Sequence, residues 1–95
     1  MRERIQILRS AVEREHKCKA KHADYVHVIL KEALVKPWEG IVEVFDLVGH
    51  PEAKRCYAWR ELDGTNVKCI TVLDIAPVTS PELAVRAAIA NANKK

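Results

Sequence analysis

One hairpin near the C-terminus constrains the fold of this chain more than any other feature. Residues 63–66 read Asp-Gly-Thr-Asn, a strong turn signal, and they separate two runs rich in aromatic and β-branched residues, 53–62 and 67–76. A four-residue loop places Leu62 opposite Val67. Four favourable cross-strand pairs then face one another: Glu61 with Lys68, Trp59 with Ile70, Tyr57 with Val72, and Arg55 with Asp74. A slip by one residue breaks all four pairs, so the spacing predicts this register.

This register sorts the side chains of the two strands onto opposite faces. One face is mostly small or aliphatic and suits the close approach of helices; it includes Cys56, Ala58, Cys69 and Leu73. The other face carries Tyr57, Trp59, Ile70 and Val72. An aromatic side chain buries about 150–250 Å², and monomers seldom expose apolar patches beyond a few hundred Å². With the helices on the first face, the aromatic face needs a partner, and a second copy of the chain is the partner we expect.

The rest of the chain predicts a helix at each end of a sheet. Apolar residues at three- and four-residue steps predict a helix over residues 1–17, and alternation predicts strands over 24–34 and 38–47. The basic segment between the helix and the first strand has no apolar stripe, so we expect it to fray or turn. Ser80 as an N-cap before Pro81 starts a second, alanine-rich helix over residues 81–92.

These elements predict one α+β domain. Short connections make residues 24–76 a four-stranded antiparallel meander, flanked by the helices 1–17 and 81–92. Burying both amphipathic helices on one sheet face is the economical arrangement, so we expect a two-layer sandwich with the N- and C-terminal helices on the same face.

The positive charge gathers at the N-terminus. The net charge is +3, and residues 1–24 hold seven Lys and Arg against four acids. The candidate anion-binding residues are Arg14, Lys17, Lys19 and Lys21. Joined to the Tyr57/Trp59 face, they give the alternative hypothesis of a single-strand nucleic-acid binder, in which bases stack on aromatic rings beside basic residues. A solvated helix face explains the same charges, because nucleic-acid-binding domains usually carry a stronger basic bias.

Two residue groups could carry chemistry, and we expect neither to do so. His16, Cys18 and His22 are proper zinc ligands, but interleaved lysines repel a cation and a fourth ligand is not evident. Cys56 with His50 is the only nucleophile–base combination, and nothing marks an oxyanion site beside it. We therefore expect no catalytic residue, no metal and no cofactor.

The remaining expectations concern location. No apolar run approaches the roughly 18 residues of a membrane helix, and the charged N-terminal residues do not resemble a secretory signal. Three cysteines without metal or redox spacing are typical of free thiols in a reducing cytoplasm. We expect a cytoplasmic protein that has no membrane partner.

Four stretches resemble a family of short uncharacterised bacterial proteins. They are WEGIVEVFDLVGHP at residues 38–51, YAW at 57–59, and PVTSP at 77–81 followed by AVRAAI at 84–89. The resemblance covers roughly residues 38–89 and implies a bacterial source. That family has no established activity, so the resemblance brings no catalytic residues.

The sequence leads to a non-enzymatic interaction or binding module as the first functional hypothesis. We expect it to form a homodimer through Tyr57, Trp59, Ile70 and Val72. Single-stranded nucleic-acid binding is the alternative, and a small-molecule pocket between helices and sheet stays open.

Overall fold

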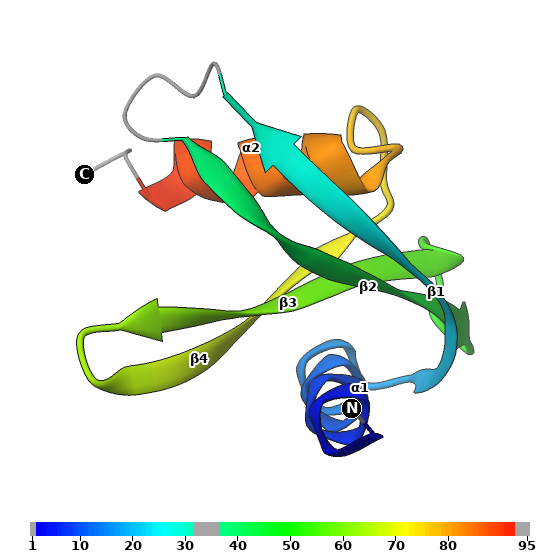
Figure 1. Cartoon of the computed structure of the whole chain (residues 1–95). Helices are drawn as coiled ribbons and strands as arrows, with labels where there is room; N and C mark the ends of the chain where they lie inside the picture. Colours follow the sequence, from blue (N-terminus) through cyan, green and yellow to red (C-terminus); the bar gives the residue numbers. More distant parts are fainter. Residues whose placement is uncertain (1, 32–36, 93–95) are drawn as a thin grey trace.

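The computed structural model describes residues 2–31 and 37–92 and shows a mixed α+β fold (Figure 1). The elements follow in the order α1 (Arg2–His16), β1 (Lys19–Leu30), β2 (Trp38–Val48), β3 (Arg55–Asp63), β4 (Asn66–Leu73) and α2 (Pro81–Ala92). The four strands form one antiparallel sheet in the order β1-β2-β3-β4. The predicted fold class and meander are confirmed; the predicted end of the first strand, at residue 34, lies outside the described residues.

The register of the β3–β4 hairpin is confirmed. Trp59 lies opposite Ile70 and Tyr57 opposite Val72, and the ladder closes one pair further than predicted, at Asp63 and Asn66. The turn therefore consists of Gly64 and Thr65 alone. Gly64 has a φ of 67°, in the left-handed region that suits a glycine in such a tight turn.

The start of β1 differs from the prediction, because the strand begins at Lys19 and not at residue 24. Ala20 is buried beneath α1, and its N–H donates to Glu13 Oε2 at 2.9 Å. The alternation of lysines with Ala20 and His22 is thus a half-buried strand, and a bulge between His22 and Asp24 shifts its register. The lysines at the outward positions concealed this pattern.

The C-terminal helix begins as predicted. Ser80 Oγ accepts the N–H of Leu83 at 3.2 Å, and Ser80 C=O accepts the N–H of Ala84 at 3.0 Å. These are the bonds of an N-cap, and they fix the first turn of α2.

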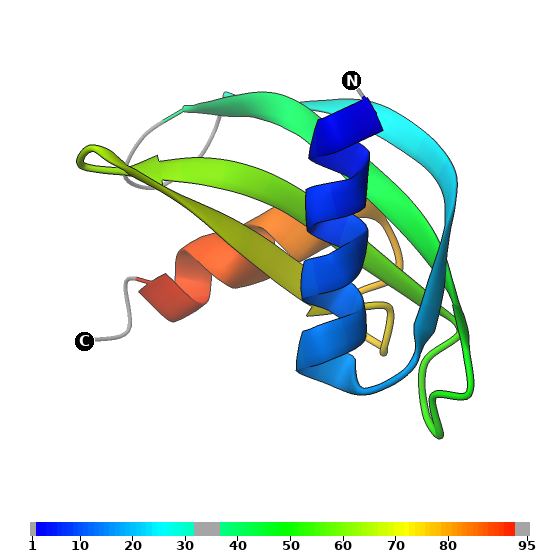
Figure 2. The same ribbon diagram turned by 90° about the horizontal axis from the view of Figure 1, so that it is seen from below.

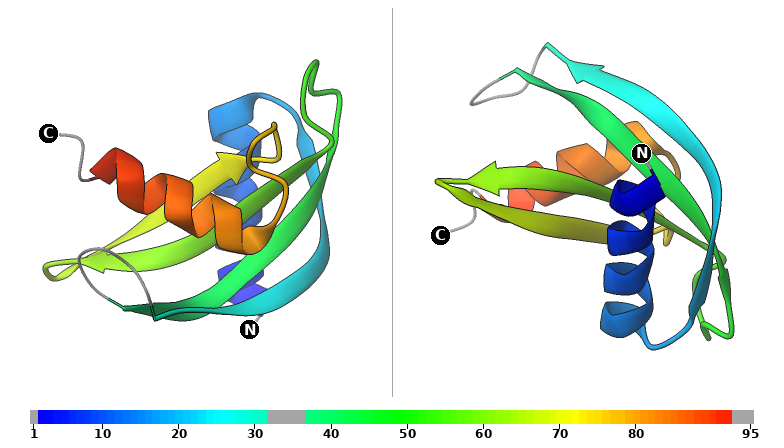
Figure 3. Two further views of the ribbon diagram at one scale, coloured as in Figure 1. Left: turned by 90° about the horizontal axis from the view of Figure 1, so that it is seen from above. Right: turned by 60° about the horizontal axis from the view of Figure 1, so that its bottom comes forward.

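The prediction that both helices cover one sheet face is wrong, because α1 and α2 lie on opposite faces (Figures 1 and 3). α1 covers the face with Cys56 and Ala58, where its Leu8 and Val12 pack against Phe45. α2 covers the aromatic face instead; its cluster includes Val28, Val42, Val44, Tyr57, Trp59, Ala84 and Val85. Both faces of the sheet are apolar near its centre, so each needs a helix, and the result is three layers.

The sheet is divided between β2 and β3. β1 pairs with β2 from Lys19↔Val48 to Leu30↔Trp38, but the register of β2 with β3 covers only residues 43–46 with 55–58. Beyond Glu43 and Ala58 the two strands diverge, and the β1–β2 and β3–β4 hairpins separate toward one end (Figure 2). The two hairpins are thus separate at one end of the sheet and paired at the other, and α1 crosses the paired end.

Candidate functional site

The predicted aromatic face exists, but it is not free. Tyr57 is 3% exposed and Trp59 is 1% exposed, and Ile70 and Val72 pack against the same cluster. α2 covers these side chains within the chain itself. The expectation that this face is open to a second subunit or to nucleic-acid bases is therefore wrong, since the apolar area that seemed to need a partner is already buried.

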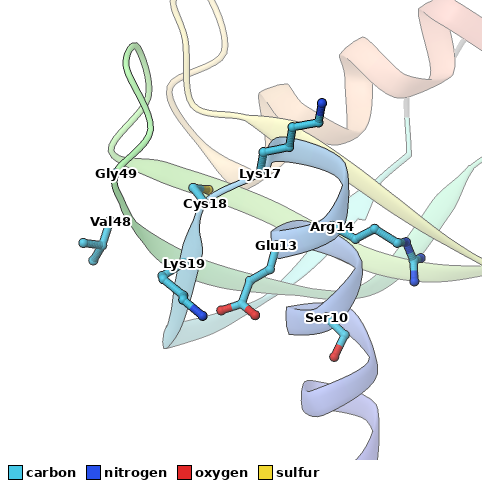
Figure 4. A pocket seen from close by; sticks show the side chains of 8 residues that line it. All are labelled: Ser10, Glu13, Arg14, Lys17, Cys18, Lys19, Val48 and Gly49. Atoms are coloured by element: carbon cyan, nitrogen blue, oxygen red, sulfur yellow. The ribbon is translucent and has the colours of Figure 1, made fainter.

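The predicted basic residues do not converge. Arg14, Lys17 and Lys19 line a shallow pocket of about 600 Å³ where α1 ends near Gly49 (Figure 4). Lys19 points toward Glu13, while the side chains of Arg14 and Lys17 point away from it and from each other. Lys21 is exposed on β1 and does not line the pocket. An anion in this pocket would meet the Glu13 carboxylate beside scattered cations, a poor arrangement for phosphate.

The two histidines of the candidate zinc site contact other side chains. His16 Nε2 lies 3.0 Å from Thr71 Oγ1, while His22 Nε2 lies 2.7 Å from Glu43 Oε1. The described residues contain no cluster of three or more His, Cys, Asp or Glu arranged to hold a metal.

The cysteine–histidine combination is inert in this geometry. Burial raises the pKa of the Cys56 thiol to about 12, so the nucleophilic thiolate is not populated near neutral pH. His50 Nδ1 accepts the N–H groups of Glu52 and Ala53 at 3.1 and 2.9 Å, and so caps the β2–β3 turn.

A different surface stands out: half of the face that carries α1 has no helix over it. Its apolar side chains are strongly exposed, with Tyr25 at 62%, Ile29 at 50% and Leu62 at 77%. We call the exposed part of this face the open half. The registers place its residues in two groups, one on each hairpin: Tyr25, His27, Ile29, Glu39 and Ile41 on β1 and β2, and Arg60, Leu62 and Val67 on β3 and β4. Exposed apolar side chains gathered on one face mark interaction surfaces.

Glu43 marks the border between the covered and the open half. This carboxylate is 2% exposed, accepts from Arg4 Nη2 at 2.9 Å and lies 2.7 Å from His22 Nε2. It joins the N-terminal turn of α1 to β1 and β2. A buried carboxylate requires such partners, so the network fixes where α1 lies and where the open half begins.

The outer part of the open half belongs to the edge strand β1. Tyr25, His27 and Ile29 form its β1 stripe, and His27 Nε2 lies 2.8 Å from Glu39 Oε2. Along the strand's free edge runs a groove of about 470 Å³ between residues 26–29 and 80–82. Among the described residues, no strand pairs with β1 on that side.

The inner part of the open half borders a slot between the divergent ends of β2 and β3. This slot, of about 420 Å³, is lined by residues 38–41 and 59–62. The strand alternation places Trp38, Gly40, Trp59 and Glu61 on its α2 side and Glu39, Ile41, Arg60 and Leu62 on its open side. Trp38 Nε1 and Trp59 Nε1 both donate to Glu61 Oε2, at 3.3 and 2.7 Å.

Sequence reasoning missed both the open half and the slot. Assigning two helices to one face left no exposed area there, although Tyr25 and Ile29 alternate visibly with Val26 and Val28. The slot gives no sequence signal, because it depends on where the β2–β3 register ends.

Two further observations concern membrane-spanning helices and similarity to known proteins. No helix among the described residues has the length and apolar character needed to cross a membrane. Comparison of the chain with protein-family models, curated proteins and solved structures yields no match. The resemblance of residues 38–89 to a bacterial family thus stays a prediction, and the candidate site stands on the geometry of this chain.

Proposed function

We propose that this protein is a non-enzymatic interaction module that self-associates by pairing the free edges of two β1 strands. The observation that supports this most directly is the unpaired edge of β1 beside the exposed stripe Tyr25, His27 and Ile29. A long edge strand without charges or proline readily pairs with another strand. Between Tyr25 and Leu30 there is neither.

The rest of β1 confines the pairing to this segment. Lys19 and Lys21 stand at the start of the strand, and the bulge between His22 and Asp24 breaks its regular edge. Lysines and bulges are devices that keep an edge unpaired. Only residues 24–30 therefore present a regular edge.

A two-fold axis at His27 gives the most favourable register. Antiparallel pairing of two identical strands with matching faces then sets Tyr25 opposite Ile29 of the partner subunit, twice, with the two His27 side chains at the axis. Aromatic–aliphatic cross-strand pairs stabilise a sheet by about 0.2–1 kcal/mol each. The stripes of the two subunits then form one continuous apolar surface.

The alternative of nucleic-acid binding has no comparable support, because its stacking residues are buried and its cations diverge.

A charge-swap series with light scattering on a sizing column tests the proposal. The wild-type protein at about 100 µM gives a dimer mass; Tyr25→Lys/Ile29→Lys gives a monomer, because lysines face each other across the junction. Tyr25→Lys/Ile29→Glu restores the dimer, since each lysine then faces a glutamate.

Leu62→Lys is the matched control. It adds a lysine at another exposed apolar position of the open half, on β3, and leaves the dimer intact. A monomeric wild-type protein at this concentration, or a Tyr25→Lys/Ile29→Glu variant that stays monomeric while Leu62→Lys dimerises, overturns the proposal.

A further inference from the structure

We propose that the slot between β2 and β3 binds an extended peptide segment that carries a basic side chain. This inference does not rest on self-association, because the slot lies on the opposite side of β2 from the free edge of β1. It rests on three properties of the slot: its backbone groups, its charge, and its fixed width.

The walls of the slot are two strand segments whose facing edges are not paired with each other. β2 bonds to β1 through its outer edge over residues 38–42, but its register with β3 stops at Glu43↔Ala58. β3 likewise bonds to β4 over residues 59–62. Alternate residues of both segments therefore direct N–H and C=O groups into the slot. An extended peptide satisfies such groups by adding a strand to an exposed edge.

The charged groups of the slot select the peptide's side chain. Among the lining residues, Glu39 and Glu61 outnumber the single cation Arg60. Glu39 is already in contact with His27, and Lys68, opposite Glu61 on β4, does not line the slot. Both indole N–H groups already donate to Glu61 Oε2. Neither bond uses the second carboxylate oxygen, Oε1, and a lysine or arginine side chain can donate to it.

Contacts across the slot hold its width. Trp38 comes from β2 and Glu61 from β3, so their hydrogen bond spans the gap, and the rings of Trp38 and Trp59 meet edge to face with centroids 5.9 Å apart. Gly40 makes room for this arrangement, since a Cβ there would lie 2.9 Å from the Trp38 ring. A site whose walls are held in place before binding loses less conformational entropy when it binds.

The chain's own fluorescence reports on the slot, because Trp38 and Trp59 are its only two tryptophans. Titration with the capped pentapeptide Val-Lys-Val-Lys-Val shifts or quenches this fluorescence in a saturable way. The peptide Val-Glu-Val-Glu-Val has no such effect at the same concentrations. Glu61→Gln weakens binding of the lysine peptide about tenfold or more, because it removes the charge and keeps an acceptor for the indoles.

Two controls separate the slot from a general attraction of cations. Glu52→Gln removes one negative charge in the exposed β2–β3 turn and leaves binding unchanged. In hydrogen exchange followed by NMR, the bound lysine peptide slows amides of residues 39–42 and 59–62, as strand addition requires. Urea unfolding of Glu61→Gln verifies that the variant is folded before its binding is compared.

Three results overturn the proposal: tryptophan fluorescence that does not respond to the lysine peptide, equal binding by Glu61→Gln and the wild-type protein, or binding without slower exchange at the slot amides. Tyr25→Lys/Ile29→Lys binds the peptide as the wild-type protein does. A failure of self-association and a failure of peptide binding are thus distinguishable.

Discussion

The two faces of the sheet each carry one helix, but only one face is closed. The core cluster that contains Ala84 and Val85 of α2 includes residues from all four strands, and Trp59 within it is only 1% exposed. The contacts of α1 gather at one end of its face, around Phe45 and Cys56, and Leu62 at the other end is 77% exposed. A chain of this size cannot bury all of its surface. Here the remaining apolar area is concentrated on one half-face, where a partner can use it.

The largest loss of stability should come from removing a buried side chain on the face that α2 covers. Trp59→Ala removes a buried indole and its 2.7 Å hydrogen bond to Glu61, and we expect it to lower the free energy of unfolding by about 3–5 kcal/mol. Leu62→Ala, on the open half, should change it by less than about 0.5 kcal/mol. Urea unfolding followed by circular dichroism measures both. Similar losses for the two variants would contradict the contrast between the faces.

The border between the covered and open halves gives the next largest effect. Glu43→Gln removes the buried charge that Arg4 and His22 contact, and should lower the free energy of unfolding by about 1–3 kcal/mol. The exposed pair of His27 with Glu39 provides the control, because Glu39→Gln should cost less than about 1 kcal/mol. Equal costs in urea unfolding would show that Glu43 does not anchor α1.

A smaller change in stability is expected at the residues that connect α1 to β1. Lys17 directly follows the helix with a φ of 53°, a conformation that costs a residue with a Cβ about 1 kcal/mol relative to glycine. Lys17→Gly should therefore raise the free energy of unfolding by up to about 1 kcal/mol. Lys19→Gly, two residues on in β1, should lower it by about 0.5–1 kcal/mol. Thermal and urea unfolding of the two variants test the opposite signs.

The smallest effect concerns pH at the far end of α1. Burial lowers the pKa of His16 below 6.5; Glu15 opposes this shift and His50 adds to it. The unfolded chain then binds a proton that the folded chain takes up less readily, so stability falls as the pH drops below 6.5. His16→Gln keeps a group that can bond to Thr71 Oγ1 and should flatten this slope. Urea unfolding at about pH 7.5 and about pH 5.5 compares the slopes; an unchanged slope would assign the pH dependence to other groups.

The same contrast explains what the sequence could predict. The β3–β4 register followed from local pairs such as Trp59 with Ile70, and the start of α2 followed from Ser80 and Pro81, because turns and caps act between near neighbours. The face of the sheet on which each helix packs could not be predicted from such local patterns. Both sheet faces offer apolar residues, and the choice depends on the total area buried.

The open half was hidden for a related reason. Exposure of Tyr25 and Leu62 is set by the position of α1, which in turn depends on the long-range contact of Arg4 with Glu43. No local pattern marks that contact. The β1 strand could have been extended back to Lys19 from its alternation, but the lysines at the outward positions read equally well as a solvated segment.

The short β2–β3 ladder also has a consequence for how the chain folds. Each hairpin forms between neighbours in sequence, so most of the sheet assembles without a long search through distant contacts. The backbone register that joins the two hairpins covers residues 43–46 and 55–58, between the two helices. Docking of α1 and α2 clamps this seam from both sides, so that two separate cooperative units become one. We therefore expect the β2–β3 seam to form last in the sheet, and its amides to exchange slowly once both helices have docked.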